Sequence, residues 1–222
     1  MNARNLCAAL AALILAVGCG HAGDDAKKTA VPAATPQTAH AQQGTLDNLQ
    51  KAFNGESGAK ARYEAFAKKA DAEGYQGVAS LFRAAAKSEA VHAAKFEKLI
   101  VKLGATVKPV SATLALKTTK ENLEAAIAGE TEEMTNIYPQ CATQATTDKN
   151  SDAAKVFSGT AKVEGTHAAL YKEALSKMLD GLEKAKTEYN VCPVCGYVAV
   201  GTADFKKCPV CSEPRAKFET VN

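Results

Sequence analysis

Two copies of the motif Glu-x-x-His occur in the sequence, at Glu89/His92 and at Glu164/His167. Residues three apart share a face of a helix, so each pair presents a carboxylate and an imidazole to one site. Such groups are ligands of transition metals. The stretches ASLFRAAAKSEAVHAA, from residue 79, and AKVFSGTAKVEGTHAA, from residue 154, match at eight of sixteen positions without a gap. The two pairs therefore belong to an internal repeat.

A further glutamate precedes each pair at nearly the same spacing. Glu56 stands 33 residues before Glu89, and Glu130 stands 34 residues before Glu164. Each half of the repeat therefore carries one Glu on its first helix and Glu-x-x-His on its second. Glu133 is one position away from the apolar stripe of its own helix.

The segments that carry these groups have a helical period between residues 45 and 188. Apolar residues recur at steps of three and four, which is the pattern of a bundle helix. The four stripes include Leu46, Leu49, Phe53, Tyr63, Ala67 and Ala70; Val78, Phe82, Ala85, Phe96, Leu99 and Leu103; Leu116, Leu123, Ile127, Met134 and Ile137; Ala153, Phe157, Tyr171, Ala174 and Met178. With turns at 73–77 and 147–151 and a crossover at 104–113, the sequence predicts a mainly α fold, a four-helix bundle.

The acidic residues interrupt the apolar stripes near their middle, and a solvated charged face fits this placement poorly. Each buried ion costs several kcal/mol even after relaxation. Lys60 and Lys120 are the cations that could neutralise them. Two metal ions would match the five carboxylates in charge. A Glu from each of two helices with Glu-x-x-His from the other two is the di-iron carboxylate pattern. Gly165 is small enough to let the neighbouring helix approach.

The C-terminal residues 189–222 carry a second ligand set with the spacing C-x2-C-x12-C-x2-C. Four thiolates from Cys192, Cys195, Cys208 and Cys211 make a tetrahedral site for iron or zinc. A structural zinc ribbon is one interpretation. Cys141 stands alone in the sequence, and its spacing places it toward the bundle core as a buried structural thiol, with a reactive thiol as the alternative.

The N-terminal residues read as a targeting segment. Arg4 precedes an apolar run that ends at Val17, and residues 1–18 are predicted to be a signal peptide, too short for a stable membrane span. Residues 16–19 resemble a bacterial lipobox with Ala16 in place of the usual Leu, which makes Cys19 a lipidation candidate. Simple cleavage near Ala22 is the alternative. Residues 19–44 are polar, rich in Ala, Pro and Thr, and predicted to be a disordered tether.

From residue 45 to 222 the chain resembles rubrerythrin. The resemblance rests on NGESGAKARYEAF, SEAVHAAKF, AGETEEMTNIYP, VEGTHAALY and the two cysteine knuckles. It implies a ferritin-like bundle over 45–188 and a rubredoxin-like domain over 189–222. All seven family ligand positions are filled, by Glu56, Glu89, His92, Glu130, Glu133, Glu164 and His167. The first knuckle resembles rubredoxin, whereas Ser212 stands where the second knuckle of rubredoxins usually has Gly.

The resemblance implies two iron ions in the bundle and one, with zinc as the alternative, on the cysteines. It further implies that the protein reduces hydrogen peroxide to water, with electrons from the rubredoxin-like iron of the partner subunit in a head-to-tail homodimer. Glu133 and His92 would exchange as ligands to one iron. Tyr63 and Tyr138 match family tyrosines near the site, either as hydrogen-bond donors to a ligand carboxylate or as redox participants.

Two other functions remain open from the sequence: a ferroxidase or iron-handling protein, and a non-catalytic metal-binding module. Net charge is +3 with the charges interspersed, so no basic stripe suggests nucleic-acid binding. We expect an exported, periplasmic protein that contacts the membrane only through a lipid on Cys19. An exported protein needs an electron-donor protein on that side of the membrane, such as a cytochrome, and no residue identifies it.

Overall fold

The computed structural model describes residues 42–111 and 113–222. The predicted signal peptide, Cys19 and nearly all of the predicted tether lie outside these residues. Among the described residues, no helix combines the length and the apolar character that crossing a membrane requires.

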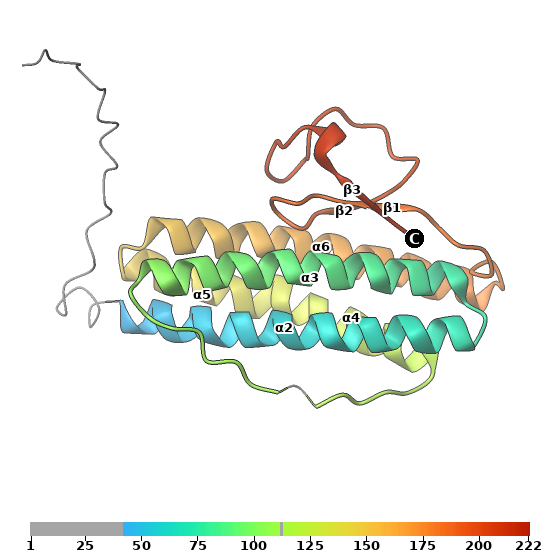
Figure 1. Cartoon of the computed structure of the whole chain (residues 1–222), viewed down its shortest axis with the longest axis horizontal. Helices are drawn as coiled ribbons and strands as arrows, with labels where there is room; N and C mark the ends of the chain where they lie inside the picture. The colour runs from blue at the N-terminus through green and yellow to red at the C-terminus, as the bar shows by residue number, and fades with distance from the viewer. Residues whose placement is uncertain (1–41, 112) are drawn as a thin grey trace, which may run out of the picture. The chain divides into compact units, whose positions relative to one another are not determined.

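Four long helical rods form an antiparallel bundle, as the sequence predicts (Figure 1). The first hairpin consists of α2 (Gln43–Ala72) and α3 (Gln76–Lys102). After an extended crossover, the third rod runs through α4 (Thr119–Glu132), the π-helical turn η1 (Glu133–Ile137) and α5 (Tyr138–Thr147). The fourth rod is α6 (Ser151–Leu179), which packs against α4 and α5.

The third rod departs from the sequence prediction at both ends of its apolar stripe. Leu116 is 52% exposed and precedes the helix, because Thr118 and Glu121 form a capping box that starts α4 at Thr119. Ile137 is 43% exposed, because η1 inserts a wider turn that rotates the following residues away from the seam. The structure thus corrects the stripe at its first and last members.

Proline explains where the π-helical turn ends. Pro139 has no N–H to donate to a carbonyl one turn earlier, and its ring crowds that carbonyl. The chain meets this constraint by widening into η1 and then restarting an α-helix at Tyr138, with Pro139 in the first turn of α5. The distortion at Pro139 is therefore a change of helix type within the third rod.

The apolar core of the bundle is split into two clusters with the ionisable residues between them. One cluster contains aromatic rings of Tyr63, Phe66, Phe82 and Tyr171, and the other contains those of Phe96, Tyr138 and Phe157. Rings within each cluster lie 5.2–6.1 Å apart between centroids. Such contacts fix the level at which the polar residues face each other.

The C-terminal domain is a small antiparallel sheet of order β2-β1-β3. Its strands are β1 (Tyr189–Val191), β2 (Val198–Val200) and β3 (Glu219–Val221), and the 3-10 turn η2 (Arg215–Lys217) precedes β3. Both faces of β1 are buried, and the strand contacts α3. The predicted fold class, a helical bundle followed by a small domain with a four-cysteine cluster, is confirmed.

Candidate metal centres

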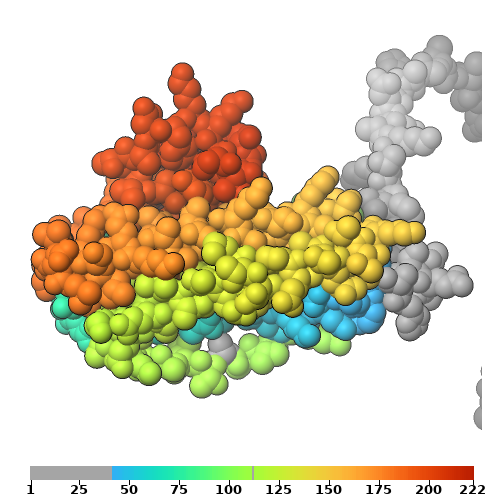
Figure 2. Space-filling model, turned by 180° about the vertical axis from the view of Figure 1, so that it is seen from behind, coloured from blue at the N-terminus to red at the C-terminus, as the bar shows by residue number. Residues whose placement is uncertain are grey.

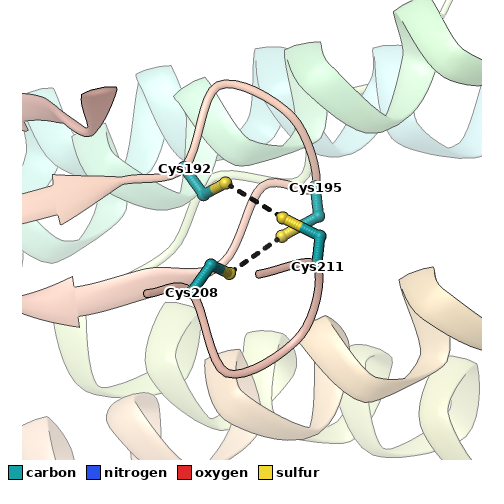
Figure 3. A group of neighbouring side chains, drawn as sticks. All are labelled: Cys192, Cys195, Cys208 and Cys211. Carbon is teal, nitrogen blue, oxygen red and sulfur yellow. Dashed lines mark hydrogen bonds between the residues drawn. The ribbon is translucent and has the colours of Figure 1, made fainter. Parts of the chain in front are cut away.

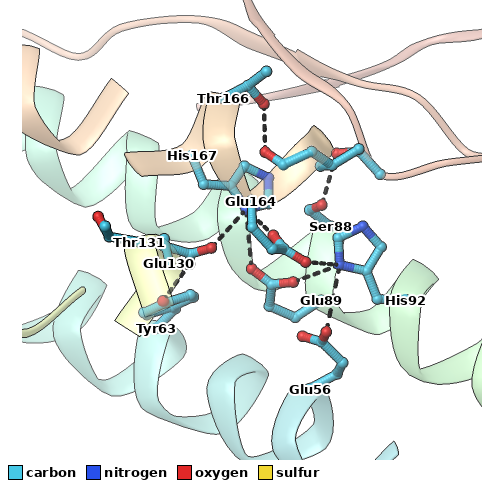
Figure 4. A network of polar contacts seen from close by, with 12 residues as sticks. Glu56, Tyr63, Ser88, Glu89, His92, Glu130, Thr131, Glu164, Thr166 and His167 are labelled. Carbon is cyan, nitrogen blue, oxygen red and sulfur yellow. Dashed lines mark hydrogen bonds and ion pairs between the residues drawn. The ribbon is translucent and has the colours of Figure 1, made fainter. Parts of the chain in front are cut away.

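Six of the seven predicted bundle ligands come together at the middle of the four rods (Figure 4). They form two overlapping groups, in each of which the ligand atoms lie within 4.8 Å of one another. The first group is Glu56, Glu89, His92 and Glu164; the second is Glu89, Glu130, Glu164 and His167. Glu89 and Glu164 belong to both groups, so each is placed to bridge two ions.

These six side chains are buried, and many of their polar atoms lack a hydrogen bond of good geometry: Glu56 Oε2, Glu89 Oε1, Glu130 Oε2, both oxygens of Glu164 and both ring nitrogens of His167. The histidines face the carboxylates at ion-pair distance, with His92 Nδ1 and His167 Nδ1 each 2.9 Å from an oxygen of Glu164. A buried polar atom without a partner is costly and rare in native proteins. Here they converge on one region, and their chemistry is that of a carboxylate and imidazole metal site. The residues therefore fit a pair of metal ions.

The cluster lacks a lysine or arginine that would balance its acidic groups. The side chain of Lys60 is 44% exposed and pairs with Glu64, and that of Lys120 is 51% exposed and pairs with Glu124. Neither of the two candidate cations named from the sequence therefore reaches the site. The acidic groups can therefore be balanced only by other members of the cluster and by bound ions.

Burial and mutual charge shift the pKa values of the clustered groups. Burial raises the pKa of Glu130 to about 8, helped by the charges of Glu89 and Glu164. Burial alone would lower the pKa of His92, but the carboxylates of Glu164 and Glu89 raise it to about 10. Burial and neighbouring carboxylates also raise the pKa of Glu56 well above its ordinary value. These shifts favour protons on Glu56, Glu130 and His92, and a bound metal would displace them.

Glu133 is the predicted ligand that the structure leaves outside both groups. It begins the π-helical turn, three residues after Glu130, and is only partly buried. Its charge nevertheless raises the pKa of Glu56, and the charge of Glu130 raises the pKa of Glu133. His92 instead points its Nδ1 into the first group, 2.9 Å from Glu89 Oε2 and 2.9 Å from Glu164 Oε1.

Two buried tyrosines hold the outer carboxylates. The hydroxyl of Tyr63 donates to Glu130, and the hydroxyl of Tyr138 donates to Glu56. Each tyrosine also belongs to one of the two aromatic clusters, so packing fixes the donor. The predicted hydrogen bonds to ligand carboxylates are therefore present.

The glycine in the second Glu-x-x-His motif is explained by a close approach. A Cβ built on Gly165 would lie 2.8 Å from the sulfur of Met134, which belongs to η1. The small residue thus admits the widened turn of the neighbouring rod, as the sequence suggests.

The second candidate centre gathers all four C-terminal cysteines (Figure 3). The sulfurs of Cys192 and Cys211 are 3.6 Å apart, and those of Cys195 and Cys208 are 3.5 Å apart. None of the four is in a disulfide. Four thiols converging in this way fit one tetrahedral ion, iron or zinc.

Each knuckle ends on a residue with positive φ. In the first, the N–H of Gly196 donates to the carbonyl of Cys192, and in the second the N–H of Ser212 donates to the carbonyl of Cys208. The φ angles are 84° for Gly196 and 65° for Ser212. Ser212 therefore carries a conformational cost that glycine would not.

The first knuckle touches the bundle site directly. His92 Nε2 lies 3.0 Å from the carbonyl oxygen of Cys195, and the Ser88 hydroxyl donates to the carbonyl of Gly196. Because a carbonyl only accepts, Nε2 of His92 carries the proton of this hydrogen bond. A Cβ on Gly196 would lie 2.5 Å from Ser88 Oγ and 2.6 Å from His92 Nε2.

The sequence did not predict the role of Ser88. It also did not predict that Gly196 must be small because Ser88 and His92 lie against it. A serine beside a ligand and a glycine after a knuckle are common, and neither carries a signal of their pairing. Cys141, expected in the core, is 9% exposed, and burial raises the pKa of its thiol.

Comparisons with known proteins agree with this geometry. A family model described as rubrerythrin matches residues 47–175, and one described as the rubredoxin-like domain of rubrerythrin matches residues 191–219. Rubrerythrin from Porphyromonas gingivalis is 38% identical over 181 residues, which cover 80% of this chain and 90% of that protein. Nigerythrin from Nitratidesulfovibrio vulgaris is 36% identical over 175 residues, which cover 78% of this chain and 85% of that protein.

Solved structures extend the likeness to three dimensions. Nigerythrin in its fully reduced, all-ferrous state superposes with a TM-score of 0.72 at 33% identity, covering 89% of this chain and 91% of that one. A bacterioferritin from Desulfovibrio desulfuricans reaches a TM-score of 0.61 at 18% identity, covering 67% of this chain and 87% of that one. The second match concerns the bundle fold alone.

Proposed function

Because this chain belongs to the rubrerythrin family, we propose that it is a non-haem di-iron peroxidase that reduces hydrogen peroxide to water in oxidative-stress defence. The observation that carries the proposal is the contact between the four-cysteine knuckle and the bundle site through Cys195 and His92. A site that only stores or oxidises iron needs no sulfur-bound metal beside it. A peroxidase does, because each peroxide consumes two electrons and two protons and yields two waters.

The ligands for two irons in the bundle would be Glu56, Glu89, His92, Glu130, Glu164 and His167. Glu133 would be the seventh ligand, which exchanges with His92. When bound, the iron pair would supply one electron from each metal to the O–O bond, and an iron on the four cysteines would replace them. The chain positions the ligands through the hydroxyl donors of Tyr63 and Tyr138. Its aromatic clusters exclude water from both ends of the site.

The residues also supply a route for protons and electrons. The hydrogen bond from the Tyr138 hydroxyl to Glu56 gives a proton a path between these two groups, and Glu133 lines the same cavity as Tyr138. On the opposite side, His92 Nε2 donates to Cys195 and its Nδ1 faces the carboxylates. His92 therefore joins the two candidate centres by bonds rather than through space.

The decisive test is peroxide turnover by protein loaded with iron at both sites and given a reductant. We expect Cys208→Ser to lose steady turnover, because electrons no longer reach the bundle site. The same variant, reduced beforehand with dithionite, should still consume one equivalent of peroxide. Equal turnover by wild type and Cys208→Ser would overturn the electron-transfer part. Faster reoxidation of the reduced bundle site by oxygen than by peroxide would favour a ferroxidase.

Zinc in the cysteine site provides the matched control. Zinc fits the same four thiolates but has no redox chemistry. Wild-type protein with zinc at the cysteines and iron in the bundle should behave as Cys208→Ser does. Full turnover by the zinc form would support a structural role for the C-terminal domain.

Export and assembly are further proposals that rest on the sequence. We infer that residues 1–18 direct export, that Cys19 carries a lipid, and that the protein acts in the periplasm with an external electron-donor protein. Labelling with a radioactive fatty acid, lost in Cys19→Ala, would test this. The head-to-tail homodimer, with electrons from the partner subunit, stays a proposal from the resemblance, whereas the Cys195–His92 contact lies within one chain. Light scattering of the purified protein tests the dimer.

A further inference from the structure

The bundle site needs an entrance, because its six clustered ligands are at most 1% exposed. Within the bundle, the aromatic cluster of Tyr63, Phe82 and Tyr171 covers it on one side, and that of Phe96, Tyr138 and Phe157 covers it on the other. The edge at His92 is covered by the carbonyl of Cys195 and by Gly196. A small substrate must therefore enter between two rods on another flank.

A cavity of about 490 Å³ lies on such a flank, between α2 and the η1–α5 part of the third rod. Figure 2 shows the start of α2, in blue, and η1–α5, in yellow, meeting at the surface there. One wall consists of Asn48, Lys51, Ala52 and Gly55, which share one face of α2. The other wall consists of Glu133, Ile137, Tyr138, Gln140, Cys141 and Gln144.

The shape of the cavity follows from its residues. Ala52 and Gly55 leave space on α2 where larger side chains would close the gap. Opposite them, η1 turns Ile137 outward to 43% exposure, so it stands beside the opening instead of plugging the core. Asn48, Gln140 and Gln144 add amide groups to the lining, which suits a small molecule that forms hydrogen bonds.

The cavity is connected to the ligand groups through one hydrogen bond, although none of the six clustered ligands lines it. Tyr138 and Glu133 both line it, and the Tyr138 hydroxyl donates to Glu56 of the first ligand group. A second cavity of about 570 Å³, between α2 and α3, has no such connection. Its lining of Lys60, Glu64, Lys68, Arg83 and Lys87 with alanines includes no ligand and no residue hydrogen-bonded to one.

We propose that the cavity lined by Gly55 and Ala52 of α2 and by Ile137 and Tyr138 of the third rod is the entry route for hydrogen peroxide. This assignment rests on the proposed peroxidase function for the identity of the substrate. Substrate and electrons then reach the bundle site from different directions, the first past Tyr138 and Glu133, the second through His92. Gly55 is a specificity-determining residue, since its missing side chain sets the width of the route.

The experiment fills the cavity and follows azide, a small anion that binds iron. A Cβ on Gly55 meets nothing within 4 Å, so Gly55→Leu projects into open space without displacing backbone. Gly159→Leu is the matched control, because Gly159 is also helical, also has nothing within 4 Å, and does not line the cavity. In iron-loaded protein, stopped-flow absorbance should show azide binding slowed about tenfold or more in Gly55→Leu and nearly unchanged in Gly159→Leu.

A second readout involves neither turnover nor iron chemistry. Cys141 lines the same cavity, so its alkylation by iodoacetamide, located by peptide mapping of the metal-loaded protein, should also slow in Gly55→Leu. If Gly55→Leu does not fold, Ile137→Trp fills the cavity from the opposite wall at an exposed position and should give the same two results.

Azide binding at the wild-type rate in a filled variant would overturn the proposal, as would equal slowing by Gly159→Leu. The failure of the peroxidase function would look different. In that case wild type would not consume peroxide, while azide binding would still depend on residue 55.

Discussion

The two candidate metal centres are built in opposite ways. The cysteine site takes its ligands from residues 192–211, on two knuckles of like geometry, whereas the bundle site takes its ligands from residues 56–167, on all four rods. The cysteine site has one kind of ligand. The bundle site has two imidazoles, unpartnered oxygens and a spare carboxylate at Glu133. The proposed function would use this difference, with electron transfer at the cysteine site and exchange of Glu133 and His92 as ligands at the bundle site.

The largest expected effect tests whether the two centres are independent. Glu89 belongs to both ligand groups of the bundle site, so Glu89→Ala should remove both of its ions while the cysteine ion stays. Cys208→Ser should do the reverse. Metal analysis per chain measures both. Glu132→Ala is the control, because Glu132 lies beside the ligands of the third rod, belongs to neither group and should change neither content. Loss of the cysteine ion in Glu89→Ala would show that the centres assemble together.

The second largest effect concerns the protons that the bundle site must release when it binds metal. In the metal-free bundle site, His92, with a pKa of about 10, and Glu130, with a pKa of about 8, hold protons at pH 7. The pKa values of His167, Glu56 and Glu133 are also raised, by neighbouring carboxylates for the histidine and first by burial for the acids. Binding of metal must displace these protons, so affinity rises with pH between about 6 and 8.

Each displaced proton changes the apparent affinity about tenfold per pH unit while its group is protonated. The measurement is a ferrous titration of protein whose cysteine site is already filled, in weak buffer with a pH indicator. Release of several protons for each pair of ions is expected. An affinity that does not change from pH 6 to pH 8 would mean that the bundle site is already deprotonated.

Much of the difference between the two centres could be predicted from the sequence, because it depends on the spacing of their ligands. The cysteine knuckles are local, so four residues specify the site. The bundle ligands are far apart in the sequence. The repeated Glu-x-x-His motif and the glutamates in the apolar stripes nevertheless predict that they meet near the middle of the four helices. The tyrosine hydrogen bonds are one of the two roles that the family resemblance implies, and the small residue at Gly165 is expected beside a neighbouring helix.

What the sequence could not give depends on local backbone geometry and on contacts between domains. The π-helical turn moves Glu133 out of the ligand groups and Ile137 to the surface. The sequence features that accompany this turn are Glu133, one place off the apolar stripe, and Pro139. The pairing of Ser88 with Gly196 joins residues 108 apart in the sequence, with no periodicity to link them. The cavity beside Gly55 depends on the first of these features, the widened turn.

A smaller effect examines the junction between the centres. Gly196→Ala meets two obstacles, the left-handed φ of 84° and the contacts with Ser88 and His92. Gly74→Ala is the matched control, since Gly74 has a φ of 81° and nothing within 4 Å of an added Cβ. Gly74→Ala should lose about 1–2 kcal/mol of stability from backbone strain, and Gly196→Ala should lose more, because the added Cβ also displaces Ser88 or His92. Only Gly196→Ala should also slow oxidation of the reduced cysteine iron by peroxide, by about tenfold.

Stopped-flow absorbance of the ferric cysteine centre measures that rate, and denaturant unfolding measures stability. If both variants lose stability and oxidise at the wild-type rate, the Cys195–His92 contact does not limit electron transfer. If both slow the reaction, the effect comes from general destabilisation and the contact has no special part.

The smallest effect compares the two knuckles with each other. Ser212 occupies, with a φ of 65°, the place that Gly196 occupies in the first knuckle. A residue with a Cβ lowers the stability of the fold by about 1–2 kcal/mol when its φ is left-handed. Glycine lowers it by about 0.4–1 kcal/mol, because it gives the unfolded chain more conformational freedom. Ser212→Gly should therefore stabilise the C-terminal domain by roughly 0.5–1 kcal/mol. Ser212→Ala keeps the strain and is the control. Loss of the cysteine-site absorbance in denaturant measures the change, and lower stability in Ser212→Gly than in Ser212→Ala would mean that the strain is already relieved.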